Sequence, residues 1–286
     1  MKNENNINKI LIMGLPATGK TTFIAALWYQ LLHADDNTLL KLEKLDGDNL
    51  YFNSISDSWN KFEPVDRTKT HNLFSKVLLL RNQTNNNLFQ LMIPDISGEI
   101  FDRQFNNRTI SKDYFDFVNN VNNIMLFIHP DKIKQSYNID DLIDAFDDIS
   151  TQQDETKQND WSPQIAPTQV KLVELLQLYL LKCCDNLNLL IILSAWDTVE
   201  KLSTANCISP LEWTKTNLPL LWQYLESNNE FIKYSTIGVS AQGFDYDDNI
   251  DLKKIDFKKR VKVSFSNKET HDITECLTWF NMAVNE

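Results

Sequence analysis

Eight consecutive residues near the start of the chain have the types and spacing that would hold phosphate groups. Residues 14–21, Gly-Leu-Pro-Ala-Thr-Gly-Lys-Thr, match the pattern G-x-x-x-x-G-K-[ST]. The glycines allow backbone angles that bulkier residues avoid, so the loop can curl and point successive N–H groups at a β-phosphate. Lys20 would lie between the β- and γ-phosphates as a point charge, and the Thr21 hydroxyl would ligate Mg²⁺. The predicted nucleotide-binding residues of this segment are Gly14, Leu15, Pro16, Ala17, Thr18, Gly19, Lys20, Thr21 and Thr22.

The sequence on either side of this loop predicts the elements that a phosphate-binding loop requires. Residues 9–13 are a short, mostly apolar run that predicts a buried strand ending at the loop. Residues 22–28 continue as an apolar helix whose positive N-terminal end would face the phosphates. Strand, loop and helix in this order favour phosphate binding over an ordinary glycine turn.

A second segment with suitable chemistry follows the apolar run at residues 88–93. Asp95 would meet the phosphate loop at the same sheet edge and hold Mg²⁺ directly or through water. Gly98 would let a backbone N–H approach the γ-phosphate, and an Asp-Ser-Gly turn without a ligand is the alternative. Upstream, Thr68 is the candidate catalytic and metal-binding threonine that contacts Mg²⁺ and the γ-phosphate, and Thr70 is its alternative.

Two later segments complete a characteristic order of motifs. Residues 193–197, Leu-Ser-Ala-Trp-Asp, and residues 238–243, Gly-Val-Ser-Ala-Gln-Gly, each come at the end of a predicted strand. In this order the chain resembles the P-loop GTPases of the translation-factor-related and Ras-like class. Those proteins have an N-K-x-D motif and an S-A element at these two places. For Asp197, the alternative is a helix N-cap without a ligand.

The resemblance implies how a guanine base would be bound. The Asp197 carboxylate would accept the guanine N1 and N2 hydrogens, and a backbone N–H at Ser240 and Ala241 would meet the guanine O6. Ser194 and Ala195 stand where the class has Asn and Lys. The carboxylate acceptor is therefore kept and the lysine that packs on the base is lost, which leaves GTP and ATP both open as the ligand.

Within this class the chain resembles the double-GTPase group of bacterial conflict and defence systems. The stretches that carry the resemblance are residues 14–28, 94–99, 193–197 and 272–279. It implies a Mg²⁺-dependent GTP-binding and hydrolysing switch that acts with protein partners encoded nearby, and a second GTPase is one candidate partner. Small GTPases commonly have a water-orienting Gln directly after the D-x-x-G glycine. This chain has Glu99 there, so Glu99 is the candidate catalytic residue and turnover without a partner is expected to be slow.

The catalytic residues leave a second class of function open. Intact Lys20, Thr21 and Asp95 favour an active hydrolase. The alternative is a nucleotide-binding scaffold with little hydrolysis, or a P-loop ATPase. Arg103 and Arg108 are candidates for an internal arginine finger, with surface charge pairing as the simpler interpretation.

Composition narrows the classes of partner. The formal net charge is -11 and the basic residues at 258–262 form only a short run, so no nucleic-acid partner is expected. No apolar run reaches the roughly 18–20 residues of a membrane span, and the polar N-terminus has no signal-peptide pattern. We therefore expect a cytoplasmic protein without a membrane segment. The cysteines lack a C-x-x-C arrangement and are expected to be buried free thiols: Cys183, Cys184, Cys207 and Cys276.

The predicted elements alternate between strands and helices, which defines the fold class. Their order predicts an α/β, three-layer P-loop NTPase fold with helices on both faces of a mostly parallel six-stranded sheet. One antiparallel strand comes from the hairpin of residues 74–80 and 88–93. Residues 39–43 fit either an extra strand or a helical turn, and residues 210–227 predict one helix in spite of Pro219.

The chain is expected to be one domain with an internal insertion. Residues 1–286 form the predicted single GTPase-like domain. Residues 131–167 are rich in Asp, Asn, Gln and Ser and predict a polar, mobile insertion. This insertion is the candidate partner-contact segment.

Overall fold

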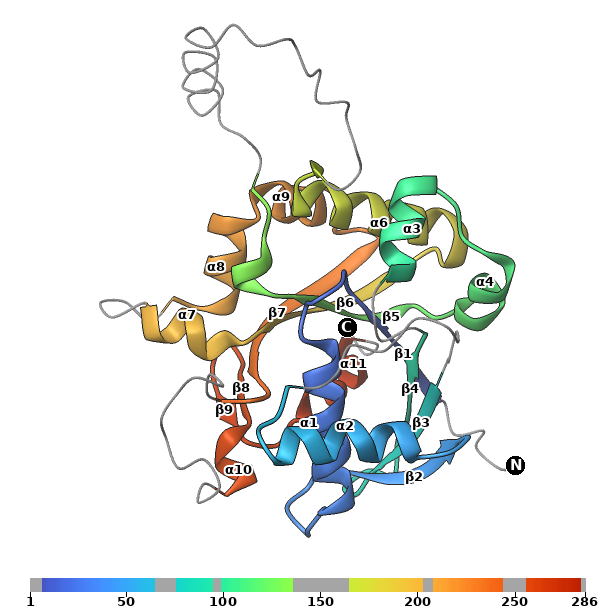
Figure 1. Ribbon diagram of the computed structural model, residues 1–286. Helices are drawn as coiled ribbons and strands as arrows, with labels where there is room; N and C mark the ends of the chain where they lie inside the picture. The colour runs from blue at the N-terminus through green and yellow to red at the C-terminus, as the bar shows by residue number, and fades with distance from the viewer. Residues whose placement is uncertain are drawn as a thin grey trace, which may run out of the picture.

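A central β-sheet lies between two layers of helices (Figure 1). The computed structural model describes residues 7–64, 76–94, 99–135, 165–202, 208–243 and 256–283. One helical layer contains α1 (Lys20–Leu32), α2 (Leu50–Asn60) and α11 (Glu275–Ala283). The opposite layer contains α3 (Glu99–Asn107), α4 (Lys112–Val118), α6 (Thr168–Cys183), α7 (Trp196–Leu202), α8 (Pro210–Asn217) and α9 (Pro219–Ser227). This arrangement confirms the predicted α/β three-layer class.

The sheet has parallel strands in its centre and antiparallel strands at both ends. Its order is β2-β3-β4-β1-β5-β6-β7-β8-β9, and β4, β1, β5, β6 and β7 run parallel. The central strands are β4 (Leu88–Ile93), β1 (Ile7–Met13), β5 (Asn123–Ile128), β6 (Leu187–Ser194) and β7 (Ile232–Ser240). The antiparallel strands are β2 (Leu40–Asp46), β3 (Lys76–Asn82), β8 (Lys262–Ser264) and β9 (Glu269–Thr270).

The predicted count of six strands with one antiparallel strand was wrong. Residues 39–43, which fitted a strand or a helical turn, lie largely within the edge strand β2. β8 and β9 extend the other end of the sheet with only three and two residues. Edge strands are short, or carry charged residues on an exposed side, and so lack the continuous apolar run that marks a buried strand. β2 is an example, because charged residues interrupt its leucines in the sequence Leu-Lys-Leu-Glu-Lys-Leu-Asp.

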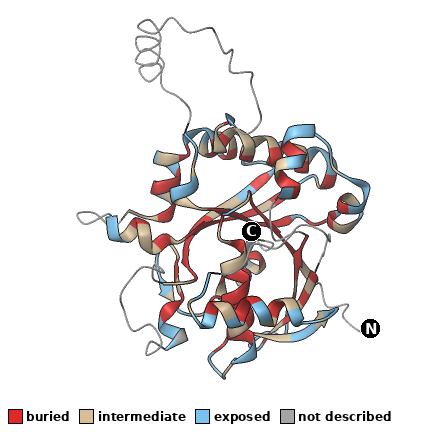
Figure 2. Ribbon diagram, viewed as in Figure 1, coloured by how far each residue is buried: buried red, intermediate tan, exposed pale blue. Residues whose placement is uncertain are grey.

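The central strands β5 and β6 are almost entirely apolar because both of their faces are buried (Figure 2). Alternate residues of a strand point to opposite faces. On β1, Ile10 and Ile12 pack in the core beneath α1, and Leu11 and Met13 pack in the core beneath α6. Burying each such side chain stabilises the fold by roughly 1.5–3 kcal/mol. Because β1 places side chains in both cores, it is held in the middle of the sheet.

Helix boundaries differ from the sequence prediction where proline and short length matter. The single helix expected at residues 210–227 is two helices, because Pro219 has no N–H to continue α8 and begins α9 instead. The capping box of Ser209 and Glu212 starts α8. The nine-residue helix α3 was not predicted from the sequence, and the seven-residue helix α7 was anticipated only by the N-cap alternative at Asp197. Within the described residues, two further short helical segments are η1 (Pro130–Lys132) and α10 (Phe257–Arg260).

Three of the predicted cysteine positions are described, and each is a free thiol. Cys183 and Cys276 are buried and Cys184 is half-buried, whereas Cys207 lies outside the described residues. Burial raises the pKa of Cys183 to about 11 and that of Cys184 to about 12. Of the predicted insertion, residues 136–164 also lie outside the described residues. Among the helices that the structure describes, none combines the length and apolar character needed to span a membrane.

Candidate nucleotide-binding site

The phosphate-binding loop joins β1 to α1, and its glycines stand where larger residues would not fit. Gly19 precedes α1 in the left-handed conformation, at φ +84°, and a Cβ on it would lie 2.8 Å from the Ser194 side chain. A Cβ on Gly14 would lie 2.9 Å from the backbone oxygen of Phe127 on β5. Since real Cβ atoms do not approach other atoms this closely, the loop can curl against β5 and β6 only with glycine at both positions.

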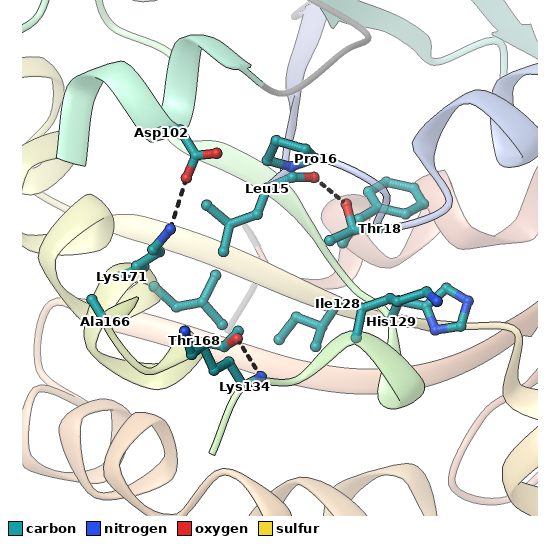
Figure 3. A pocket seen from close by; sticks show the side chains of 13 residues that line it. Leu15, Pro16, Thr18, Asp102, Ile128, His129, Lys134, Ala166, Thr168 and Lys171 are labelled. Carbon is teal, nitrogen blue, oxygen red and sulfur yellow. Dashed lines mark hydrogen bonds and ion pairs between the residues drawn. The ribbon is translucent and has the colours of Figure 1, made fainter. Parts of the chain in front are cut away.

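Lys20, the first residue of α1, is buried within the loop. Its ammonium donates hydrogen bonds to the backbone oxygens of Gly14 at 2.8 Å and Leu15 at 2.6 Å. The Thr18 hydroxyl donates to the same Leu15 oxygen at 2.8 Å (Figure 3). The cation therefore lies at the N-terminal end of a 13-residue helix that has no acidic residue in its first turn. The helix dipole and the ammonium together concentrate positive charge where a phosphate group would bind.

Mg²⁺ prefers oxygen ligands, and the first turn of α1 supplies one. Thr21 directly follows the buried Lys20 and is itself half-buried. Thr22 comes next and has the same half-buried environment. Within the described ranges, no group of three or more His, Cys, Asp or Glu side chains could hold a metal. A Mg²⁺ site made of phosphate oxygens, one hydroxyl, one carboxylate and waters needs no such group, so the Thr21 position fits this ion.

Four predicted site residues fall outside the part of the chain that the structure describes: Thr68, Thr70, Asp95 and Gly98. Their roles stay predictions. β4, the strand that precedes Asp95, lies beside β1 and runs parallel to it. Because the carboxyl ends of parallel neighbours meet at one edge of the sheet, β4 ends on the same side of the sheet as the phosphate loop.

The predicted base-binding residues come together at the ends of β6 and β7. The backbone N–H of Asp197 donates to the Ser240 hydroxyl at 2.8 Å, although the two residues are 43 positions apart. The Asp197 carboxylate is 3.7 Å from the ammonium of Lys201, one helical turn further along α7. The Asp197 side chain keeps 18% of its surface exposed, so it is accessible to a ligand at this edge.

Ala241, the other predicted base contact, is buried and tied to distant elements. Its backbone oxygen accepts the indole N–H of Trp59 on α2 at 3.0 Å. The Arg260 guanidinium lies 4.0 Å from the centre of the same indole ring and donates to the Trp59 backbone oxygen at 2.7 Å. The segment after β7 is thus anchored to α2 and to the C-terminal part of the chain.

Ser194 connects the base-binding segment to the phosphate loop. Its hydroxyl donates to the backbone oxygen of Ile128 at 3.3 Å, and its side chain packs against Gly19. A small side chain is needed there, because the phosphate loop passes directly over it. The next residue, Ala195, adopts a left-handed conformation at φ +47°. This turn directs the chain from β6 into α7 and toward Asp197.

Trp196 is a supporting residue that the sequence did not identify as important. It is 2% exposed, and its ring lies against Gly238 of β7 and edge-to-face with Trp213 at 6.4 Å. A Cβ on Gly238 would lie only 2.3 Å from this ring. The indole therefore fixes α7 against β7 directly beside Asp197. The sequence contained one usable signal, a large aromatic residue, Trp196, directly after β6 and a glycine, Gly238, within the neighbouring strand β7.

A family model described as Double-GTPase 1 matches residues 11–280. The chain belongs to the Double-GTPase 1 family. It is therefore a P-loop, GTP-binding protein, and the predicted resemblance is confirmed. No curated protein matches the chain.

Several solved structures are similar to this Double-GTPase at low sequence identity. Roco2 RocCORdC of Methanosarcina barkeri, bound to GDP, has 12% identity and a TM-score of 0.32, with 83% of this chain and 44% of that chain covered. The Ski7 GTPase-like domain of S. cerevisiae, bound to GTP, has 14% identity and a TM-score of 0.33, with 80% and 42% covered. The SRb-GTP/SRX complex of Chaetomium thermophilum has 14% identity and a TM-score of 0.38, with 80% and 89% covered. This chain thus spans less than half of the first two.

Three further candidate residues lie on α3 or directly after it. Glu99 is the first residue of this helix and is exposed, and Arg103 is exposed one turn later. Arg108, just after the helix, pairs with Glu174 of α6 at 3.2 Å and is 74% exposed. This pair matches the simpler interpretation of Arg108, surface charge pairing, because the guanidinium is already directed to α6.

Proposed function

We propose that this chain is a Mg²⁺-dependent switch that binds and hydrolyses GTP as one component of a multi-protein bacterial conflict system. Membership of the Double-GTPase 1 family supports the GTP-binding part of this proposal. The Mg²⁺ dependence, the switch function and the defence role are proposed beyond the family assignment. They rest on the residues of the site and on the resemblance to the double-GTPase group.

One observation carries the proposal: the buried cation and the proposed base-binding carboxylate follow two parallel strands of one sheet and lie at the same edge of it. Lys20 follows β1, and Asp197 follows β6, with β5 between these strands. Ser194 contacts both the phosphate loop and β5, so the two halves are linked by packing. A nucleotide can therefore place its phosphates over the loop and its base near Asp197 without a rearrangement of the core.

The chemistry that these residues would perform is positioning and charge neutralisation. Phosphoryl transfer places charge on the oxygens around the γ-phosphorus, and cations and backbone N–H groups stabilise it. Lys20 and the loop N–H groups would bind the β- and γ-phosphates. Thr21, Asp95 and Thr68 would hold a Mg²⁺ ion, which would supply positive charge against the phosphates. Glu99 would accept a hydrogen bond from the attacking water, but its negative charge near the γ-phosphate makes slow turnover the expected result.

The test is Mg²⁺-dependent binding and hydrolysis of GTP against ATP by the full chain. Lys20→Ala should weaken binding of both nucleotides by roughly 100-fold or more, because hydrogen bonds to a charged group are lost. Asp197→Ala should weaken the binding of GTP and leave the binding of ATP unchanged. A preference for ATP that Asp197→Ala does not alter would reject the guanine assignment. The matched control is Asp185→Ala, which removes a carboxylate outside the site.

The second candidate function is a nucleotide-binding scaffold with little hydrolysis. The Glu99 position and the replaced residues Ser194 and Ala195 favour it, because the first brings negative charge and the others remove contacts to the base. Measurement of phosphate release under single-turnover conditions separates the two functions. A Glu99→Ala protein that hydrolyses GTP as fast as the wild type would remove this residue from the mechanism.

The proposed partner is a second GTPase encoded nearby, and the proposed contact is the polar segment at residues 131–167. The family description supports a paired arrangement. Co-expression with each neighbouring gene product, followed by affinity purification, tests the pairing. Deletion of residues 151–160 tests the contact: if every partner interaction persists, the segment is a linker.

A further inference from the structure

Three basic residues of the short run at 258–262 contact three different elements of the fold instead of forming an open cationic surface. Lys258 pairs with the link between α1 and β2, Arg260 donates to the end of α2, and Lys262 pairs with α7. In Figure 1, β8 and β9 accordingly lie beside α7. The run therefore joins the C-terminal part of the chain to elements around the proposed nucleotide site. Of the three residues, Lys262 contacts the helix that contains the proposed base-binding residue Asp197.

The Lys262 ammonium lies between two carboxylates that belong to different elements. It is 3.0 Å from both carboxylate oxygens of Glu200 on α7 and 2.8 Å from the Glu269 carboxylate on β9. The Ser264 hydroxyl of β8 donates to the same Glu200 carboxylate at 3.4 Å. Burial alone would lower the pKa of Lys262, but its hydrogen bonds to Glu269 and Glu200 raise this pKa above the ordinary value, so the ammonium is charged at pH 7. Glu200 is thus held from β8 by one cation and one hydroxyl.

The backbone of Lys262 is fixed by the sheet at the same place. In the antiparallel pairing of β7 and β8, Lys262 is the register partner of Ser240. Ser240 in turn accepts the backbone N–H of Asp197 at 2.8 Å. Asp197 and Glu200 are three residues apart on α7, so they are neighbours on the surface of this helix. These four residues therefore form a closed ring of contacts, made of one sheet pairing, one hydrogen bond, one turn of helix and one ion pair.

α7 needs such contacts because it is too short to keep its orientation by helix formation alone. It has seven residues, whereas isolated helices shorter than about 12–15 residues are marginal in water. Trp196, at its first residue, is buried against Gly238 of β7 and fixes the start of the helix. The ion pair between Glu200 and Lys262 adds a contact in the second half of the helix. Lys262 therefore restricts rotation of α7 and, with it, the direction of the Asp197 carboxylate.

We propose that Lys262 is a positioning residue for base recognition. By holding Glu200 it sets the angle at which the Asp197 carboxylate meets the base, and it acts through α7 and not by contact with the nucleotide. This inference rests on the proposed role of Asp197 and extends it to the C-terminal strands β8 and β9. Its signature is a loss of discrimination between bases at unchanged phosphate binding, because the contacts of Lys262 lead to α7 and β7.

The test compares the two glutamates that pair with the same ammonium. Affinities of the full chain for GDP, ADP and pyrophosphate are measured by calorimetry with Mg²⁺, which separates the contribution of the base from that of the phosphates. Glu200→Gln should weaken the binding of GDP about three- to fivefold, because a part-exposed ion pair is lost, and should leave the binding of ADP and pyrophosphate unchanged. Glu269→Gln removes the other carboxylate, on β9, and is the matched control that should keep the wild-type affinity for GDP.

A double variant assigns the effect to the ion pair. Lys262→Met should weaken the binding of GDP as much as Glu200→Gln does, and the combined variant should weaken it no further. Equal weakening of GDP, ADP and pyrophosphate would show a merely structural role and overturn the proposal.

The wild type distinguishes the two levels of the inference. If it prefers GDP over ADP and Glu200→Gln keeps that preference, the positioning role of Lys262 is overturned and the base assignment stands. If the wild type has no preference for GDP and Asp197→Ala changes nothing, the base assignment is overturned and the positioning role with it.

Discussion

Replacing Gly238 by alanine should destabilise the contact between α7 and β7, beside the proposed base-binding residue Asp197, through a single overlap. The added Cβ would lie 2.3, 2.4 and 2.6 Å from three ring atoms of Trp196. Gly238 is not in the left-handed region, so its backbone accepts alanine and the effect is steric. The ring has little room to move, because Trp196 is 2% exposed and its edge packs against Trp213.

The magnitude follows from the size of the overlap. Carbon atoms in ordinary contact are about 3.5–4.0 Å apart, so each of the three contacts is short by about 1 Å. Overpacking of a well-packed core costs typically 1–3 kcal/mol and occasionally more. We expect about 3 kcal/mol for Gly238→Ala. Alanine is otherwise favoured over glycine within a strand by roughly 0.5–1 kcal/mol, which offsets only a small part of this loss.

A double-mutant cycle with Trp196→Leu isolates the overlap. The free energy of unfolding is measured in urea for the wild type, both single variants and the double variant. In the Trp196→Leu background the added methyl group meets a smaller side chain. Gly238→Ala should then cost under about 1 kcal/mol, which gives a coupling energy of about 2 kcal/mol. Additive effects, or an unchanged urea midpoint for Gly238→Ala, would refute the assignment of Trp196 as the residue that holds α7 against β7.

Three further predictions concern single side chains. Ser240→Ala removes the acceptor of the Asp197 backbone N–H and should reduce the preference for GTP over ATP by about tenfold in competition binding, whereas Ser235→Ala on the same strand should not. Arg108→Ala should leave the rate of GTP hydrolysis unchanged and the free energy of unfolding within about 0.5 kcal/mol, because the lost ion pair is exposed; a tenfold slower rate would instead make this residue catalytic. Burial lowers the pKa of His129 below its ordinary 6.5, so the unfolded chain takes up this proton first as the pH falls. The contribution of the neutral ring to the free energy of unfolding is therefore present above pH 6.5 and should be lost as the pH falls below it. The free energy of unfolding, measured by urea titration between pH 5 and 7, should fall less steeply with decreasing pH in His129→Gln than in the wild type.

The phosphate loop could be predicted from the sequence because all of its parts are contiguous. The loop oxygens that hold Lys20, the left-handed Gly19 and the helix dipole all come from one strand, one loop and one helix. Local residue types are sufficient to specify such a site, since no distant segment has to arrive for the ammonium to find its partners. The same reason explains why the buried parallel strands were recognised from their apolar runs.

Contacts between segments could not be predicted in the same way. The Asp197–Ser240 hydrogen bond exists only because β6 and β7 are neighbours in register, and the packing of Trp196 on Gly238 depends on the same pairing. The pocket lined by Leu15, Ile128 and Leu172 exists only where the phosphate loop, β5 and α6 come together. No pattern of nearby residues specifies these distances.

The sequence by itself therefore determined the fold class and the family resemblance, and it predicted the phosphate-binding residues. Tertiary structure decided the three additional edge strands, the supports of Asp197 and the pocket beside the phosphate loop. The physical reason is the range of the interactions involved. Backbone conformation and hydrophobic periodicity act within a few residues and leave a signal in the sequence, whereas side-chain packing joins residues whose proximity is created only when the sheet forms.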